Sequence, residues 1–160
     1  MQNKTPMQIQ RSLNVVFSFF FLSVIVVLLI SSFVVKQYGP LMDLTESSID
    51  ILKYVAIFSL VIHLPLAFYL PQKAIRKIDN NIPLKNKMYF YYKALFLRFA
   101  IITSALIIIC LFFVFTADTN IIYIAAMGLI FFLISKPNPF KTATDLNLKG
   151  EEKNQLFESK

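Results

Sequence analysis

Residues 12–35, SLNVVFSFFFLSVIVVLLISSFVV, run for 24 positions without a charged side chain. The hydrocarbon core of a bilayer is about 30 Å thick, so roughly 20 apolar residues of α-helix cross it. This stretch is therefore long enough for one membrane span. A cleaved secretory signal has an apolar core of about 7–15 residues and a small-x-small cleavage site. Because residues 33–37 offer no such site, we expect a retained span.

Three further uncharged stretches follow, at 54–72, 99–117 and 119–135. The whole chain is 57% hydrophobic and only 16% charged, against about 45–50% and about 25% in soluble domains. We therefore predict an all-α polytopic membrane protein with four transmembrane helices in an antiparallel bundle. The expected spans are about 13–35, 53–72, 95–117 and 119–135. Only Asp118 separates the last two spans, which predicts a close hairpin and leaves no room for a soluble domain of typical size.

The basic residues are distributed very unequally between the two sides of this arrangement. Of the 16 Lys and Arg residues, 14 lie in the N-terminal tail, in the loop 73–93 with its approach to the third span, or in the tail 136–160. The opposite side has only Lys36 and Lys53. The positive-inside rule therefore predicts that both termini and the basic loop are cytoplasmic.

The basic loop is the most distinctive polar segment. Its aromatic residues at 89–92 are typical of an interfacial anchor, and its cations attract anionic lipid headgroups at the cytoplasmic face. The expected headgroup contacts are Lys73, Arg76, Lys77, Lys85, Lys87, Lys93 and Arg98. A docking surface for an acidic partner is the alternative. Basic and aromatic residues also suit single-stranded nucleic acid, but at the foot of a membrane helix we expect no nucleic-acid partner.

One ionisable residue, His63, falls near the middle of the second span. The same height on the antiparallel third span is Thr103 or Ser104, so these three residues are a candidate intramembrane polar cluster. An intramembrane ionisable residue is by default a functional hypothesis. Two interpretations remain: a neutral histidine that hydrogen-bonds to Thr103, Ser104 or a backbone carbonyl and helps the helices pack, or a group that senses or relays protons.

The scarcity of reactive side chains argues against most membrane enzymes. The chain has one cysteine, Cys110, so it lacks the second thiol of a disulfide relay. One histidine is too few for a pair of haem ligands, and the spans hold too few ligands for a metal site. Three scattered glycines cannot form a phosphate loop. We predict no enzyme activity, no catalytic residues, no metal and no cofactor.

Outside the spans, two helix starts and one apolar set are predicted. Thr45 is a candidate N-cap ahead of the second span, and Asn138 followed by Pro139 should start a short helix through about Leu146. The tail, with one or two short helices, is otherwise charged but has five large apolar residues. These are Phe140, Leu146, Leu148, Leu156 and Phe157. We expect them to lie on the membrane surface, on the cytoplasmic loop or on another protein.

The pattern of the last span and tail, with Lys136-Pro137, then 145–148 (DLNL) and Glu151-Glu152, resembles small uncharacterised four-span inner-membrane proteins of bacteria. The resemblance implies a bacterial cytoplasmic membrane and transfers no activity and no site. The expected function is that of a non-enzymatic accessory or assembly subunit, with another membrane protein or a homo-oligomer as partner. The alternative is a small oligomeric transporter or channel with a polar path at His63, Thr103 and Ser104.

Overall fold

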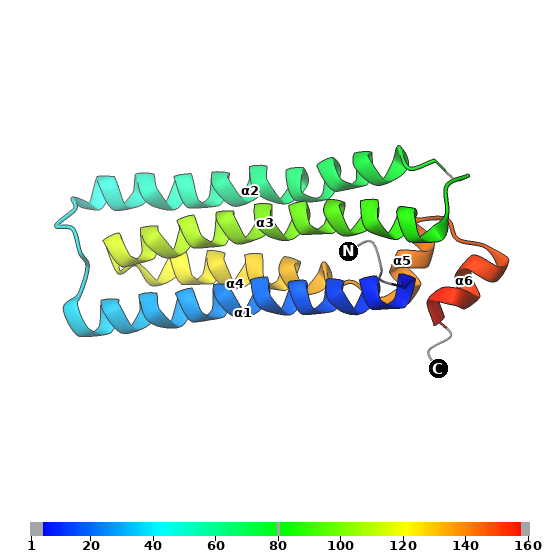
Figure 1. The fold of residues 1–160 in the computed structure, drawn as a ribbon. Helices are drawn as coiled ribbons and strands as arrows, with labels where there is room; N and C mark the ends of the chain where they lie inside the picture. The colour runs from blue at the N-terminus through cyan, green and yellow to red at the C-terminus, as the bar shows by residue number, and fades with distance from the viewer. Residues whose placement is uncertain (1–4, 80, 158–160) are drawn as a thin grey trace.

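The computed structural model describes residues 5–79 and 81–157, which form helices and their connections (Figure 1). The helices are α1 (Pro6–Tyr38), α2 (Glu46–Arg76), α3 (Leu84–Thr116), α4 (Thr119–Ile134), α5 (Pro139–Asp145) and α6 (Gly150–Phe157). The first four run antiparallel in a bundle. We call the end where α1 begins and α5 and α6 lie the basic end, and the end with residues 39–45 and the turn at 117–118 the loop end. The predicted all-α bundle is confirmed.

Helix length and hydropathy make this chain a membrane protein. Helices α1, α2 and α3 have 33, 31 and 33 residues, and each is long and apolar enough to cross a bilayer. Helix α4 has only 16 residues, or about 24 Å. It counts as a fourth span only together with α5, which is bent from it by 77°. The chain is a multi-pass membrane protein with three or four spans.

The helices at the basic end continue well beyond the apolar stretches. The segment 73–93 was predicted as a basic loop, but α2 continues to Arg76 and α3 begins at Leu84, so the connection is only 77–83. Lysine, arginine and glutamine are good helix formers, which lets the polar flanks extend each span. Pro83 stands at the N-cap of α3 and marks where that helix begins.

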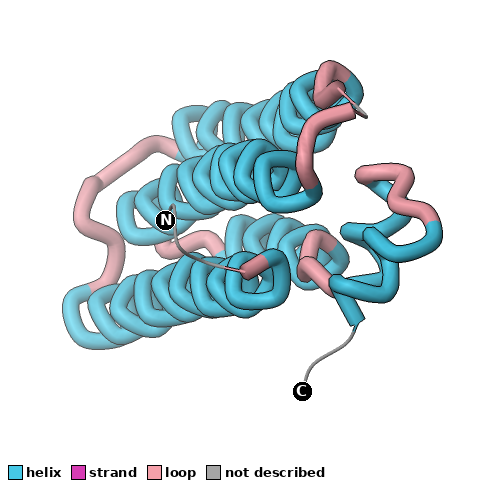
Figure 2. The backbone as a smooth tube through the Cα atoms, turned by 45° about the vertical axis from the view of Figure 1, so that its right-hand side comes forward, coloured by secondary structure: helices cyan, strands magenta, loops and turns pink. Residues whose placement is uncertain are grey.

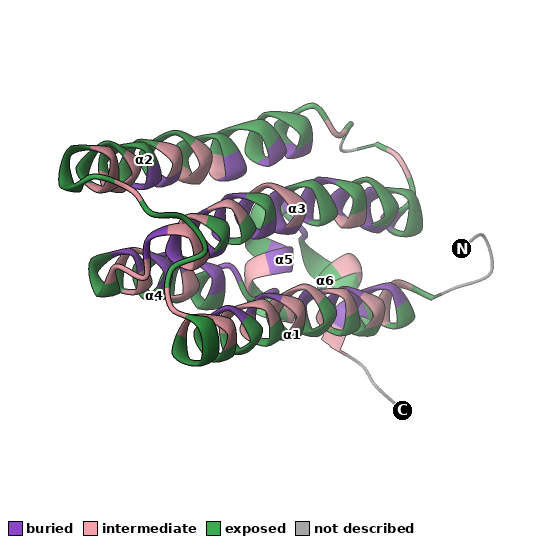
Figure 3. Ribbon diagram, turned by 90° about the vertical axis from the view of Figure 1, so that its left-hand side faces the viewer, coloured by how far each residue is buried: buried purple, intermediate pink, exposed green. Residues whose placement is uncertain are grey.

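Helix α3 lies at the centre of the bundle, with α2 and α1 on opposite sides of it (Figures 1 and 3). Half of its most apolar 18-residue window is buried, against 17% for the corresponding windows of α1 and α2. Aromatic packing joins three helices near the middle of the bundle. The rings of Phe17 on α1 and Phe132 on α4 lie 5.5 and 5.9 Å from that of Phe99 on α3.

Helix α4 approaches α3 closely, as the predicted hairpin requires. Ala117 adopts a left-handed conformation with φ of 53° between the two helices. Gly128 faces α2 and α3, and a Cβ atom there would lie 2.5 Å from Leu106 Cδ2 and 3.1 Å from Leu60 Cδ1. The absence of a side chain at Gly128 is therefore what allows this approach.

The predicted tail helix is also confirmed. The Asn138 side chain accepts a hydrogen bond from the Lys141 backbone N–H, and Pro139 is the first residue of α5. Three of the five apolar tail residues, Leu146, Leu148 and Leu156, are buried in the core shared with the bundle. Phe140 is 71% exposed, and its ring centroid lies 4.8 Å from that of Phe157. Helices α5 and α6 thus pack beside the basic end of the bundle (Figure 2).

Candidate functional site

The predicted intramembrane cluster is not joined by hydrogen bonds in the described chain. His63 Nδ1 lies 2.7 Å from the Ser59 carbonyl oxygen and 3.3 Å from Ser59 Oγ, both on its own helix. Ser104 is exposed, and its hydroxyl donates to the Ile101 carbonyl. Thr103 Oγ1 is buried and has no partner among the described residues. His63 therefore bonds to a backbone carbonyl, one of the acceptors considered for a packing histidine, and this geometry gives no support to a shared polar path.

An ion pair connects α6 to the first turn of α3. Lys87 Nζ lies 2.7 and 2.9 Å from the two carboxylate oxygens of Glu152. The Lys87 side chain is only 5% exposed and that of Glu152 is 34% exposed. Lys87 was predicted to contact lipid headgroups, but this pairing leaves it almost no free surface. Contact of the tail with the loop was one of the alternatives considered for the apolar tail residues, but the sequence has no local signal that pairs Lys87 with Glu152.

Two hydrogen bonds connect α5 to the bundle. Tyr91 of α3 donates its hydroxyl to Asp145 at 2.8 Å. The Thr142 hydroxyl lies 2.9 Å from Gln10 Oε1 of α1 and 3.0 Å from the Asn138 carbonyl. Together with the Lys87–Glu152 ion pair, these contacts fix α5 and α6 against both α1 and α3.

A pocket with a volume of about 400 Å³ lies between α2, α3 and the docked α5. Its polar lining consists of Gln72, Arg76, Arg98, Lys141, Thr144 and Asp145. Two of the predicted headgroup contacts, Arg76 and Arg98, therefore meet at one cavity. Lys141, from the tail, was not predicted to join them, since only the packing of α5 brings it there.

Arg98 is the most buried cation of this pocket. It is 5% exposed, its Nε donates to the Ala67 carbonyl at 3.3 Å, and its guanidinium lies 4.9 Å from the Phe68 ring centroid. Among residues 5–79 and 81–157, no carboxylate forms an ion pair with Arg76, Arg98 or Lys141. With Asp145 as the one acid of the lining, the pocket carries a formal net charge of +2 (three cations minus one anion).

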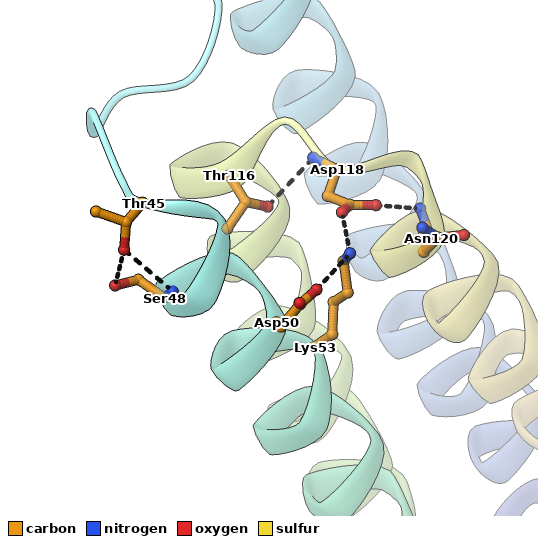
Figure 4. Close-up of polar contacts among 7 residues, drawn as sticks. All are labelled: Thr45, Ser48, Asp50, Lys53, Thr116, Asp118 and Asn120. Carbon is orange, nitrogen blue, oxygen red and sulfur yellow. Dashed lines mark hydrogen bonds and ion pairs between the residues drawn. The ribbon is translucent and has the colours of Figure 1, made fainter.

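At the loop end, a separate polar network holds α2 against the turn between α3 and α4 (Figure 4). Lys53 Nζ lies 3.0 Å from Asp50 and 2.8 Å from Asp118. Asp118 also caps α4 by accepting from the Asn120 backbone N–H at 2.8 Å. The hydrogen bond from Lys53 lowers the pKa of Asp118 below its ordinary value. At the start of α2, the Thr45 side chain accepts from the Ser48 backbone N–H, which confirms the predicted cap.

One face of the central helix remains uncovered by α1, α2 and α4. We call it the open side of α3; it consists of Leu97, Ala100, Ser104, Ile107 and Leu111, spaced by three and four residues. Ala100 is partly exposed and the other four are exposed. Ala100 and Ser104 place two small side chains one turn apart at its centre, which is the spacing that lets membrane helices approach closely.

No protein-family model matches this chain, and neither a curated protein nor a solved structure matches it.

Proposed function

We propose that this protein is a non-enzymatic accessory or assembly subunit that binds another membrane protein in the bacterial cytoplasmic membrane. The observation that supports this proposal best is the open side of α3. The most buried helix of the bundle leaves one stripe uncovered, and the stripe has Ala100 and Ser104 at its centre. A helix of a partner protein is the proposed occupant.

The chemistry of the stripe suits a helix better than an aqueous path. The Ser104 hydroxyl is already bonded to the Ile101 carbonyl, so it needs no water and adds little polarity. Leu97, Ile107 and Leu111 flank it with apolar surface. In a bilayer, helix association depends on close packing, because lipid chains are as apolar as leucine. A stripe with small side chains at its centre permits such packing.

In this proposal the basic end faces the cytoplasm. The proposal is supported by the 14 of 16 Lys and Arg residues on that side in the sequence, which the positive-inside rule assigns to the cytoplasm. Helices α5 and α6 then form a small cytoplasmic face of the subunit, held by Lys87, Tyr91 and Gln10.

Affinity purification from the native membrane in mild detergent tests the proposal. The tagged protein should retain a membrane-protein partner at native expression. Ser104→Phe should reduce the retained partner at least fivefold, because a bulky ring fills the centre of the stripe. Ser32→Phe is the matched control, since Ser32 is also exposed and also bonds to a carbonyl of its own helix, that of Leu28. A partner-free monomer, or equal losses in both variants, would contradict the proposal.

A further inference from the structure

The pocket between α2, α3 and α5 lies at the level where both long helices leave their apolar stretches. Gln72 is the last residue of the uncharged stretch on α2, and Arg98 directly precedes that on α3. Both line the pocket. In a bilayer this is the level at which hydrocarbon gives way to headgroups.

The charge in the pocket is only partly neutralised by the protein, because the lining has one acid, Asp145, against three cations. Burying an unpaired charge is costly, yet Arg98 is 5% exposed and its one hydrogen bond within the described chain is that to Ala67. Arg76 and Lys141 line the same cavity, also without an ion pair in the described chain. An anion bound among the three cations would remove this imbalance.

The geometry points to a binding site for the phosphate group of an anionic phospholipid, formed by Arg76, Arg98 and Lys141. Arginine provides several donors in a planar fork that fits phosphate oxygens, and lysine adds a compact charge. The Thr144 hydroxyl and the Gln72 amide lie in the same lining. Basic pockets between membrane helices bind anionic headgroups in this way.

The apolar surroundings favour a lipid over a free phosphate ion. Phe68 and Ile75 line the pocket with hydrocarbon surface. These two side chains provide apolar surface that an acyl chain can contact. A phosphate in solution would use only the polar half of this lining.

The site also gives the docked tail a function. Lys141 reaches the pocket from α5, and its neighbour in the lining, Asp145, is held by the Tyr91 hydroxyl. The packing of α5 on the bundle thus completes the site. The inference needs only the membrane-embedded chain and does not depend on a protein partner, so its failure would leave the accessory role open.

Native mass spectrometry of the purified full chain in detergent tests the site. Phosphatidylglycerol and phosphatidylcholine are the probes, and inorganic phosphate is the competitor. The wild type should bind one phosphatidylglycerol molecule in preference to phosphatidylcholine, with little displacement by millimolar phosphate. The double variant Arg76→Gln/Lys141→Gln should lose at least tenfold in affinity for phosphatidylglycerol.

The matched control is the double variant Lys73→Gln/Lys77→Gln, which also removes two positive charges near Arg76, from residues that do not line this pocket. The affinity of this control for phosphatidylglycerol should change less than twofold. Equal losses in the two double variants would overturn the site in favour of diffuse surface charge. No preference for the anionic lipid would also overturn it. Full displacement of phosphatidylglycerol by inorganic phosphate would show that the ligand is a soluble anion and would overturn the proposal of a lipid.

Discussion

Lys87 at the start of α3 and Glu152 on α6 are 65 residues apart in the chain, yet they form a two-pronged ion pair with N–O distances of 2.7 and 2.9 Å. This pair, with the hydrogen bonds to Tyr91 and Gln10, makes α5 and α6 part of the bundle rather than a loose tail. The basic end therefore has a defined shape, and that shape includes the pocket to which Lys141 contributes.

Glu152→Gln should loosen α6 from the bundle. The change leaves the Lys87 ammonium, whose side chain is 5% exposed, without its carboxylate. Because Glu152 is one-third exposed, we expect a cost of about 1–2 kcal/mol, less than for a fully buried pair. That cost corresponds to roughly 5–30-fold faster amide hydrogen exchange across residues 150–157. Glu151→Gln, at the exposed neighbouring position, should leave exchange unchanged; equal effects would contradict a specific pair.

Thr142→Val should weaken the attachment of α5 to α1. The Thr142 side chain is fully buried, and the change removes its hydroxyl from Gln10, whose Nε2 already has no partner among the described residues. We expect a loss of about 1–2 kcal/mol in stability, measured by thermal unfolding in detergent. In the control, Thr144→Val, the lost hydroxyl donates to the Phe140 carbonyl of the same helix. If both variants unfold at the same temperature, the contact to Gln10 contributes nothing.

Gly128→Val should separate α4 from the rest of the bundle. The new side chain would clash with Leu106 and crowd Leu60, and overpacking of this kind costs about 1–3 kcal/mol. The control Ala126→Val introduces the same β-branched residue at an exposed position of the same helix. The measurement is thermal unfolding in detergent, where only Gly128→Val should show a clear decrease. An unchanged melting temperature would contradict the close contact of α3 and α4.

Asp118→Asn should lower stability at neutral pH but not at strongly acidic pH. Its pKa in the folded protein is below the ordinary 3.8, mainly because Lys53 donates a hydrogen bond to it. The stabilisation is therefore complete above about pH 4 and is lost as the pH falls through the lower, folded pKa. Asparagine is as good an N-cap as aspartate, so the substitution isolates the charge. The melting-temperature difference from wild type should be small at pH 6, because the pair is near the surface, and should vanish near pH 2. A difference that persists there would show that charge is not the cause.

Much of the fold could be predicted from the sequence because the bilayer imposes a simple length requirement. The uncharged stretch 12–35 lies within α1, and the stretch 99–117 lies within α3 except for Ala117, which follows the end of the helix. Local capping signals at Thr45 and Asn138 are confirmed as well. The ends of the helices in the polar flanks were harder to predict, because helix propensity alone does not show where a helix ends in water. Residues 73–76 and 84–93 are therefore helical where a loop was predicted.

The candidate sites could be predicted only in part, because they depend on contacts between distant segments. The sequence suggested Arg76 and Arg98 as cationic contacts but contains no local signal that Lys141 joins them. The sequence predicted a cluster of His63, Thr103 and Ser104 because these residues lie at the same depth in the membrane on ideal antiparallel helices. Equal depth does not determine how each helix is rotated about its axis. In the structure Ser104 lies on the open side of α3, whereas His63 bonds to Ser59 of its own helix.

In the proposed function, the open side of α3 is occupied by a helix of a partner membrane protein. Photo-crosslinking in the native membrane, with a photoreactive amino acid at position 104 and, as control, at position 32, tests it most directly. We expect a discrete adduct with another membrane protein from position 104 and only lipid adducts from position 32. Lipid adducts alone at both positions, or an adduct only with a second copy of this chain, would contradict it.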